Sequence, residues 1–168
     1  MGAAPRRLFC LPSAGGGATA FMPLLTLDDE TTEICPVALP AREHRFSEPL
    51  PKSMNNLADQ MATELSPLLD RPYAILGYSM GALLGCELIR RWREAGCAEP
   101  EMFIALAARA PHLPLEDRPP LHHLEGDDFR EALIELGGTP RELLDNREAM
   151  SLFEPILRGD LKNCETHA

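Results

Sequence analysis

The hydrophobic residues of the chain gather first in four short runs, separated by polar stretches that contain glycine and proline. These runs lie at residues 6–12, 33–40, 73–77 and 101–107. Each is short, largely apolar and bounded by turn-forming residues, which is the pattern of a buried β-strand. Pro36 lies inside the second run and has no amide hydrogen to donate to a neighbouring strand, so we expect this strand toward a sheet edge or at a bulge.

Between the runs, apolar residues recur at steps of three and four, the spacing that builds one face of an α-helix. One helix is predicted over residues 53–69, with Ser53 as its N-cap. Its apolar face comprises Met54, Leu57, Met61, Leu65, Leu68 and Leu69. A second helix is predicted from Met80 to Ala95 and closed by Gly96. The glycine-rich stretch after the first strand is expected to open a further helix.

The resulting order alternates strand and helix through four strands. This alternation predicts an α/β fold whose sheet is mostly parallel and covered by helices on both faces. A proline-rich loop follows Ala107, and from Asp127 onward the chain looks wholly helical. We interpret residues 1–168 as one incomplete domain, in which a stretch from about 115 to 168 forms a helical lid inserted after the fourth strand.

Composition narrows the class of protein. Of 168 residues, 45% are hydrophobic and 25% are charged, as in an ordinary globular domain, and no apolar run has the length of a membrane span. The net charge of −10 argues against nucleic-acid binding, because phosphates would be repelled. Five cysteines occur without any Cys-x-x-Cys spacing, so we expect reduced thiols and a cytoplasmic protein.

The stretch Gly77-Tyr78-Ser79-Met80-Gly81 places a serine between two glycines where the third strand meets the second helix. This pattern fits a nucleophile elbow, in which a strained turn projects the serine hydroxyl. The glycines let strand and helix approach closely, and the positive end of the helix favours negative charge on a substrate oxygen. In the alternative interpretation the glycines only make a tight turn and Ser79 caps the helix.

A second glycine-rich stretch, residues 12–21, follows the first strand. Its three glycines are consecutive, so neither dinucleotide-binding nor P-loop spacing is present, and no cofactor or metal is expected. We interpret it as the second half of an oxyanion hole. The backbone N–H of Ala14 or Gly15 would act together with the N–H of Met80, the residue after the nucleophile. A flexible turn without a catalytic role is the alternative.

With both motifs in hand, the chain resembles the type II thioesterases of nonribosomal peptide and polyketide synthesis, a branch of the α/β-hydrolases. The likeness runs nearly end to end and is carried by RLFCLPSAGGGATAF, GYSMGALLG and RAPHLP, among other segments. Tyr78 departs from the pattern, since the family more often has histidine there. The resemblance implies hydrolysis of acyl thioesters on the phosphopantetheine arm of a carrier protein, as a housekeeping reaction. Ser79 would be the nucleophile, and the N–H groups of Met80 and Ala14 would hold the oxyanion.

The resemblance also implies a catalytic acid and a histidine on loops after two further strands, beyond the last segment of this sequence. We therefore expect an α/β-hydrolase fold that lacks its last strands, with residues 101–107 as an open apolar edge. We also expect a chain that is poorly soluble or oligomeric and nearly inactive. Surface or packing roles are predicted for the remaining candidates for acid and base, namely His44, His112, His122, His123, His167 and a solvated Asp160.

Two other functions stay open at this point. A catalytically inactive fragment could still bind a carrier protein, through the basic stretches at residues 41–45 or 89–96, although a solvated helix face is the preferred explanation of the latter. Alternatively, the same serine corner could belong to another esterase or to an acyltransferase, which would differ in the acceptor of the acyl group.

Overall fold

The computed structural model describes residues 4–27, 30–110 and 119–167. Its centre is a four-stranded sheet in the order β2-β1-β3-β4, and every neighbouring pair of strands is parallel. The strands are β1 (Arg6–Leu11), β2 (Thr32–Pro36), β3 (Tyr73–Tyr78) and β4 (Met102–Leu106). The predicted parallel α/β sheet is confirmed, and each strand lies within its predicted run or within one residue of it.

The two outer strands of this sheet match the sequence-based expectations. Pro36 lies opposite Cys10 on β2, an edge strand, where its missing N–H costs no hydrogen bond toward a further strand. At the other edge of the described sheet lies β4, whose Met102 and Leu106 side chains are 57% and 45% exposed. The expected open apolar edge is therefore present.

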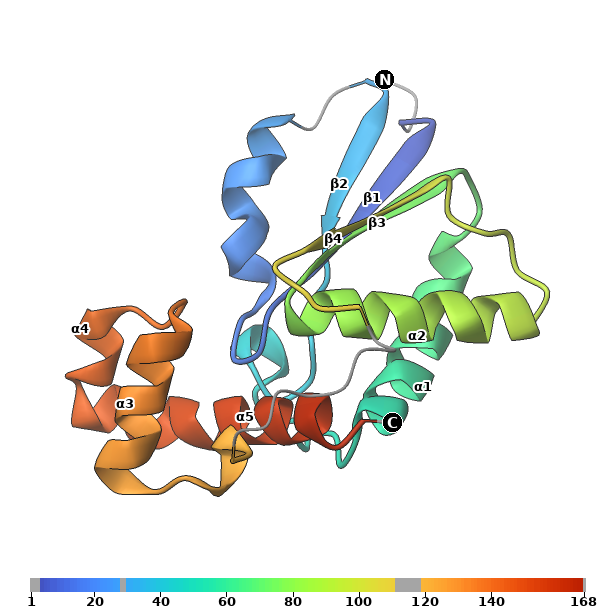
Figure 1. Ribbon diagram of the computed structural model, residues 1–168. Helices are drawn as coiled ribbons and strands as arrows, with labels where there is room; N and C mark the ends of the chain where they lie inside the picture. The colour runs from blue at the N-terminus through green and yellow to red at the C-terminus, as the bar shows by residue number, and fades with distance from the viewer. Residues whose placement is uncertain (1–3, 28–29, 111–118, 168) are drawn as a thin grey trace.

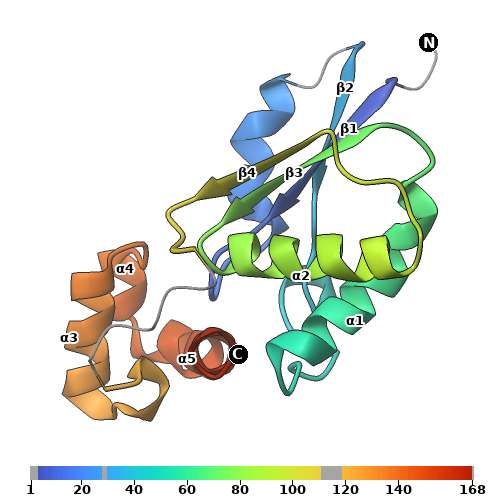
Figure 2. The ribbon, with the colours of Figure 1, turned by 45° about the vertical axis from the view of Figure 1, so that its right-hand side comes forward.

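Helices cover both faces of the sheet (Figures 1 and 2). On one face, η1 (Ala18–Leu27) packs Phe21 against Cys10 and Ile34. On the other face, α1 (Met54–Leu65) and α2 (Met80–Glu94) bury the alternate β1 residues Phe9 and Leu11. The helix predicted after the glycine-rich stretch is thus present, but it is a 3₁₀-helix containing a proline rather than an α-helix.

The larger hydrophobic cluster lies between the sheet and helices α1 and α2. Tyr73 packs edge-to-face against Trp92, with ring centroids 5.7 Å apart, and the Trp92 indole N–H donates to the Ala62 carbonyl. Ser53 caps α1 as predicted, since its hydroxyl accepts from the Asn56 N–H. The prediction that α1 continues to residue 69 is wrong in the last turn. The α-helix ends at residue 65 and a 3₁₀ turn, η3 (Ser66–Leu68), follows, because Pro67 has no N–H for an α-helical bond.

The predicted helical character after Asp127 is confirmed. The helices are α3 (Gly126–Leu136), α4 (Arg141–Leu144) and α5 (Arg147–Glu165), preceded by a short 3₁₀ turn, η4 (Leu121–His123); a further 3₁₀ turn, η2 (Glu43–Arg45), lies earlier, between β2 and α1. This helical block has its own hydrophobic cluster of Leu121, Phe129, Leu133, Leu144, Leu157 and Leu161. It lies beyond the carboxyl ends of the strands (Figure 2). None of the helices in the described ranges is both long and apolar enough to cross a bilayer.

Candidate active site

Ser79 lies at the corner between β3 and α2 with a backbone that few non-glycine residues adopt. Its φ of +52° and ψ of −112° are strained. The Ser79 N–H donates to the Leu106 carbonyl at 2.8 Å, which ties the corner to the end of β4. The serine hydroxyl makes no capping hydrogen bond to α2, so the interpretation of Ser79 as an ordinary helix cap is wrong.

The two glycines around the serine leave room that any side chain would fill. A Cβ atom on Gly77 would lie 2.5 Å from the carbonyl oxygen of Gly81 and from the Cα of Ala82. A Cβ atom on Gly81 would lie 2.1 Å from the carbonyl oxygen of Leu11, at the end of β1. The glycine spacing predicted for a nucleophile elbow therefore has a direct steric cause here.

The first turn of α2 carries amide groups that the helix itself cannot satisfy. Met80 is the first residue of α2, so its N–H has no acceptor within the helix. Its side chain is buried in the larger hydrophobic cluster, which fixes the backbone of this residue. Together with the positive end of the helix, this N–H forms a site for negative charge beside Ser79.

The glycine-rich stretch forms a tight turn over residues 13–16. The Gly16 N–H donates to the Ser13 carbonyl at 2.9 Å, and Gly15 has a φ of +70°, as the third residue of a type II turn requires. The Gly15 N–H is already bound, because it donates to Asp160 Oδ2 at 2.8 Å. For the N–H of Ala14, no hydrogen bond is found within the described ranges. Of the two N–H groups predicted as oxyanion donors, that of Gly15 is thus occupied, and that of Ala14 has no partner among the described residues.

The same turn leads into η1, whose first amides are bound by a carboxylate. Glu43 accepts from the Ala18 N–H at 3.0 Å and from the Thr19 N–H at 2.8 Å. Burial alone would raise the pKa of Glu43, but the hydrogen bonds from Thr19 and Ala18 outweigh it and lower the pKa below its usual value. Glu43 therefore holds the far end of the glycine-rich stretch as an ionised group.

This lowered pKa makes one prediction about pH. The contribution of Glu43 to stability is present above the unfolded pKa of about 4.3 and is lost as the pH falls through the lower folded value. Glu43→Gln is therefore expected to lower the free energy of unfolding at pH 7 by about 1 kcal/mol, the usual effect of a helix cap. The difference from the parent chain should shrink as the pH falls below about 4.3 in urea titrations. The prediction would be contradicted if the difference in unfolding free energy persisted at low pH, or if Glu142→Gln, at an exposed residue, gave the same difference.

A buried ion pair joins the turn to the helical block. Arg42 donates to Asp160 through both terminal nitrogens, at 2.7 and 3.0 Å, and the two side chains are 5% and 1% exposed. The expectation of a solvated Asp160 is wrong. Its position on α5 carried a signal that the sequence analysis missed: Phe153, Leu157 and Cys164 recur at helical spacing, and Asp160 falls on the same apolar face.

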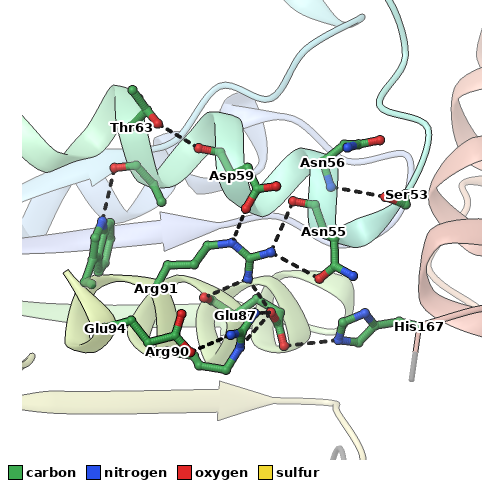
Figure 3. Close-up of polar contacts among 12 residues, drawn as sticks. Ser53, Asn55, Asn56, Asp59, Thr63, Glu87, Arg90, Arg91, Glu94 and His167 are labelled. Atoms are coloured by element: carbon green, nitrogen blue, oxygen red, sulfur yellow. Dashed lines mark hydrogen bonds and ion pairs between the residues drawn. The ribbon is translucent and has the colours of Figure 1, made fainter.

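The described histidines lie away from Ser79 or have other partners. His122 pairs with Glu165 at 2.5 Å, and His167, expected at a frayed end, is 11% exposed and contacts Glu87 at 3.2 Å (Figure 3). Glu87 is eight residues along α2 from Ser79, a rise of about 12 Å. His44 and His123 are exposed, and His112 lies outside the described residues. No hydrogen bond joins Ser79 to a histidine in the part of the chain that the structure describes.

The two basic stretches considered for carrier-protein docking are neutralised within the molecule. Arg91 bonds to Asp59 at 2.6 Å, to Glu87 and to Asn55, between α1 and α2 (Figure 3). Arg45 bonds to the carboxylates of Glu48 and Glu64. The remaining arginines of these stretches, Arg42, Arg90 and Arg93, also have carboxylate partners. Neither stretch presents an unpaired positive patch.

Comparison with known proteins gives one consistent result. A family model described as thioesterase domain matches residues 6–168. The gramicidin S biosynthesis protein GrsT of Aneurinibacillus migulanus is 36% identical over 165 residues, which are 98% of this chain and 64% of that protein. This chain therefore spans less than two thirds of that relative.

Two solved structures extend the comparison. The RedJ thioesterase of the prodiginine pathway in Streptomyces coelicolor superposes with a TM-score of 0.90 at 35% identity, over 99% of this chain and 65% of that one. The type II thioesterase YbtT of the yersiniabactin NRPS/PKS pathway superposes with a TM-score of 0.80, also at 35% identity. The match covers 98% of this chain and 66% of YbtT. The α/β-hydrolase architecture expected from the sequence is thereby confirmed, in a chain shorter than these neighbours.

Proposed function

Because the chain belongs to the thioesterase domain family, we propose that it hydrolyses acyl thioesters, with Ser79 as the nucleophile. The observation that carries this proposal is the conformation of Ser79. Its backbone has a strained, positive φ and not a helical one, and its hydroxyl makes no capping hydrogen bond to α2. The N–H of Met80, at the first helical position, and the N–H of Ala14 are the proposed oxyanion donors.

The reaction proceeds in two steps. Ser79 Oγ attacks the thioester carbonyl carbon while a general base takes its proton, and the N–H groups of Met80 and Ala14 bind the oxyanion. The C–S bond then breaks and the thiol leaves with a proton. Water next attacks the acyl-serine ester, which releases the carboxylic acid and restores the hydroxyl. Since no histidine in the described ranges contacts Ser79, the proposal assigns no general base among them.

The proposed substrate is an acyl group on the phosphopantetheine arm of a carrier protein, and the proposed role is removal of incorrect or stalled acyl groups. The support is that the similar proteins GrsT and YbtT are named for gramicidin S biosynthesis and for an NRPS/PKS pathway. Because both basic stretches are internally paired, we expect the carrier protein to be recognised through other contacts.

The test follows an acyl group loaded onto a phosphopantetheinylated carrier protein and incubated with the 168-residue chain. We expect free acid to form faster than with Ser79→Ala, at a rate below the roughly 1 s⁻¹ at which ordinary enzyme turnover begins. Transfer of the acyl group to an added acceptor in place of water would identify an acyltransferase. Binding of the loaded carrier protein with no acid above the Ser79→Ala background would identify a binding fragment.

A further inference from the structure

We propose that Asp160 and Arg42 are positioning residues for this reaction: they hold the turn at residues 13–16 in the conformation that presents the Ala14 N–H to the oxyanion. The inference rests on the proposed function, because it assigns a role to residues that touch the turn and do not touch the substrate. It is carried by the hydrogen bonds that fix each peptide plane around Ala14.

The first of these planes joins Ser13 to Ala14. In a trans peptide the C=O and the N–H point in opposite directions, so holding one fixes the other. The Ser13 carbonyl accepts from the Gly16 N–H at 2.9 Å, and this bond sets the direction of the Ala14 N–H. The bond exists only while the turn keeps its shape.

The next plane joins Ala14 to Gly15, and Asp160 holds it. Type I and type II turns differ by a flip of this central peptide, which reverses the direction of the Gly15 N–H. The 2.8 Å bond to Asp160 Oδ2 selects the orientation seen with the positive φ of Gly15. Without this acceptor, the turn loses the contact that distinguishes the two forms.

Arg42 links the Asp160 carboxylate to the last carbonyl of the turn. Its Nη1 donates both to Asp160 and to the Gly16 carbonyl, at 2.7 and 3.0 Å, and its Nε donates to Pro40 at 3.1 Å. A buried ion pair contributes little to stability compared with an apolar pair of the same volume, because both charges lose their hydration. Fixing a peptide direction, by contrast, is something that an apolar pair cannot do.

Helix α5 packs directly on this turn. A Cβ atom on Gly15 would lie 2.6 Å from Phe153 Cζ and 3.1 Å from Leu157 Cδ1. Phe153, Leu157 and Asp160 share one face of α5, so the helix supplies both the apolar contact and the hydrogen-bond acceptor. Ala14 packs against both hydrophobic clusters, that of the sheet and that of the helical block.

The test uses Asp160→Asn, which keeps the side-chain volume but removes the charge. Both Asp160 oxygens accept from donors, so the asparagine NH₂ must face either the Gly15 N–H or Arg42, and one of the contacts that hold the turn is lost. The probe is an alkyl fluorophosphonate, whose adduct on Ser79 places a phosphonyl oxygen where the thioester oxyanion forms. We measure the maximal rate of labelling and the half-saturating probe concentration by intact-mass spectrometry. The maximal rate is expected to fall about ten- to a hundredfold, which is less than the effect of removing an oxyanion donor altogether. The half-saturating probe concentration is expected to change less than about twofold.

The matched control is Glu154→Gln, which removes an i,i+4 ion pair with Arg158 on the same helix and should leave both parameters unchanged. Rates are expressed per folded molecule, measured by near-ultraviolet circular dichroism. If Asp160→Asn does not fold, Arg42→Lys makes the same test, since lysine keeps the charge but cannot reach Asp160 and Gly16 as a fork.

The outcomes separate this inference from the function on which it rests. A labelled parent chain with a folded Asp160→Asn variant that reacts at the parent rate overturns the positioning role and leaves the thioesterase proposal standing. A parent chain that shows no labelling of Ser79 overturns both. A reduced maximal rate with unchanged half-saturation supports the positioning role, because loss of folded protein alone would not change the rate per folded molecule.

Discussion

Ser79→Ala is expected to abolish covalent labelling by a fluorophosphonate and to lower the rate of thioester hydrolysis to the uncatalysed background. The reason is the geometry of the corner: the Ser79 backbone has a strained positive φ, which projects its hydroxyl from the turn, and the Ser79 N–H is bound to the Leu106 carbonyl. The measurement is intact-mass spectrometry after prolonged incubation, which records one added phosphonyl group on the parent chain.

The control for this prediction is Ser47→Ala, which replaces an exposed loop serine. It should label as the parent chain does. Equal labelling of the parent chain and of Ser79→Ala would show that the reagent reacts elsewhere, and the assignment of the nucleophile would then be wrong.

The largest expected effect on stability comes from Gly81→Ala. The added Cβ atom would lie 2.1 Å from the Leu11 carbonyl oxygen and 2.5 Å from its carbonyl carbon, so backbone would have to move against backbone. Overpacking of this kind lowers the free energy of unfolding by about 3 kcal/mol, the upper end of the usual range. Because alanine favours a helix over glycine by only about 1 kcal/mol, the net loss is expected to be about 2 kcal/mol or greater.

Helix α5 offers a matched control for that substitution. A Cβ atom on Gly159 would lie 3.6 Å from Leu50 Cδ2, an ordinary contact, so Gly159→Ala should stabilise the chain by about 1 kcal/mol. Urea denaturation of the two variants should therefore give midpoints on opposite sides of the parent. Destabilisation by both, or by neither, would contradict the steric account of the serine corner.

The sequence predicts those features of the fold that depend on local patterns. Ser79 with its two glycines lies within five residues, and its context of strand and helix can be recognised from hydrophobic spacing alone. Pro36 predicts an edge position because a single missing N–H decides it. Ser53 predicts the start of α1 for a similarly local reason, the hydroxyl acceptor three residues before Asn56.

What the sequence analysis missed depends on contacts between distant segments. Arg42 and Asp160 are 118 residues apart: the apolar spacing around Asp160 indicates that it is buried, but nothing near either residue indicates that the two pair. The same holds for His167, which was expected to be frayed and instead contacts Glu87, 80 residues earlier. The residue pattern leaves Ala14 and Gly15 open as oxyanion donors, and only the resemblance names Ala14; the contact that occupies the Gly15 N–H comes from Asp160 on the distant α5.

The hydrogen bond between the Ser79 N–H and the Leu106 carbonyl has a mechanical consequence. Leu106 is the last residue of β4, the outermost strand of the described sheet on that side. The backbone of Ser79, the proposed nucleophile, is therefore held by an edge strand and not only by the interior of the sheet. We expect a strand that adds to this edge to restrain the position of Ser79, and fraying of β4 to increase its motion.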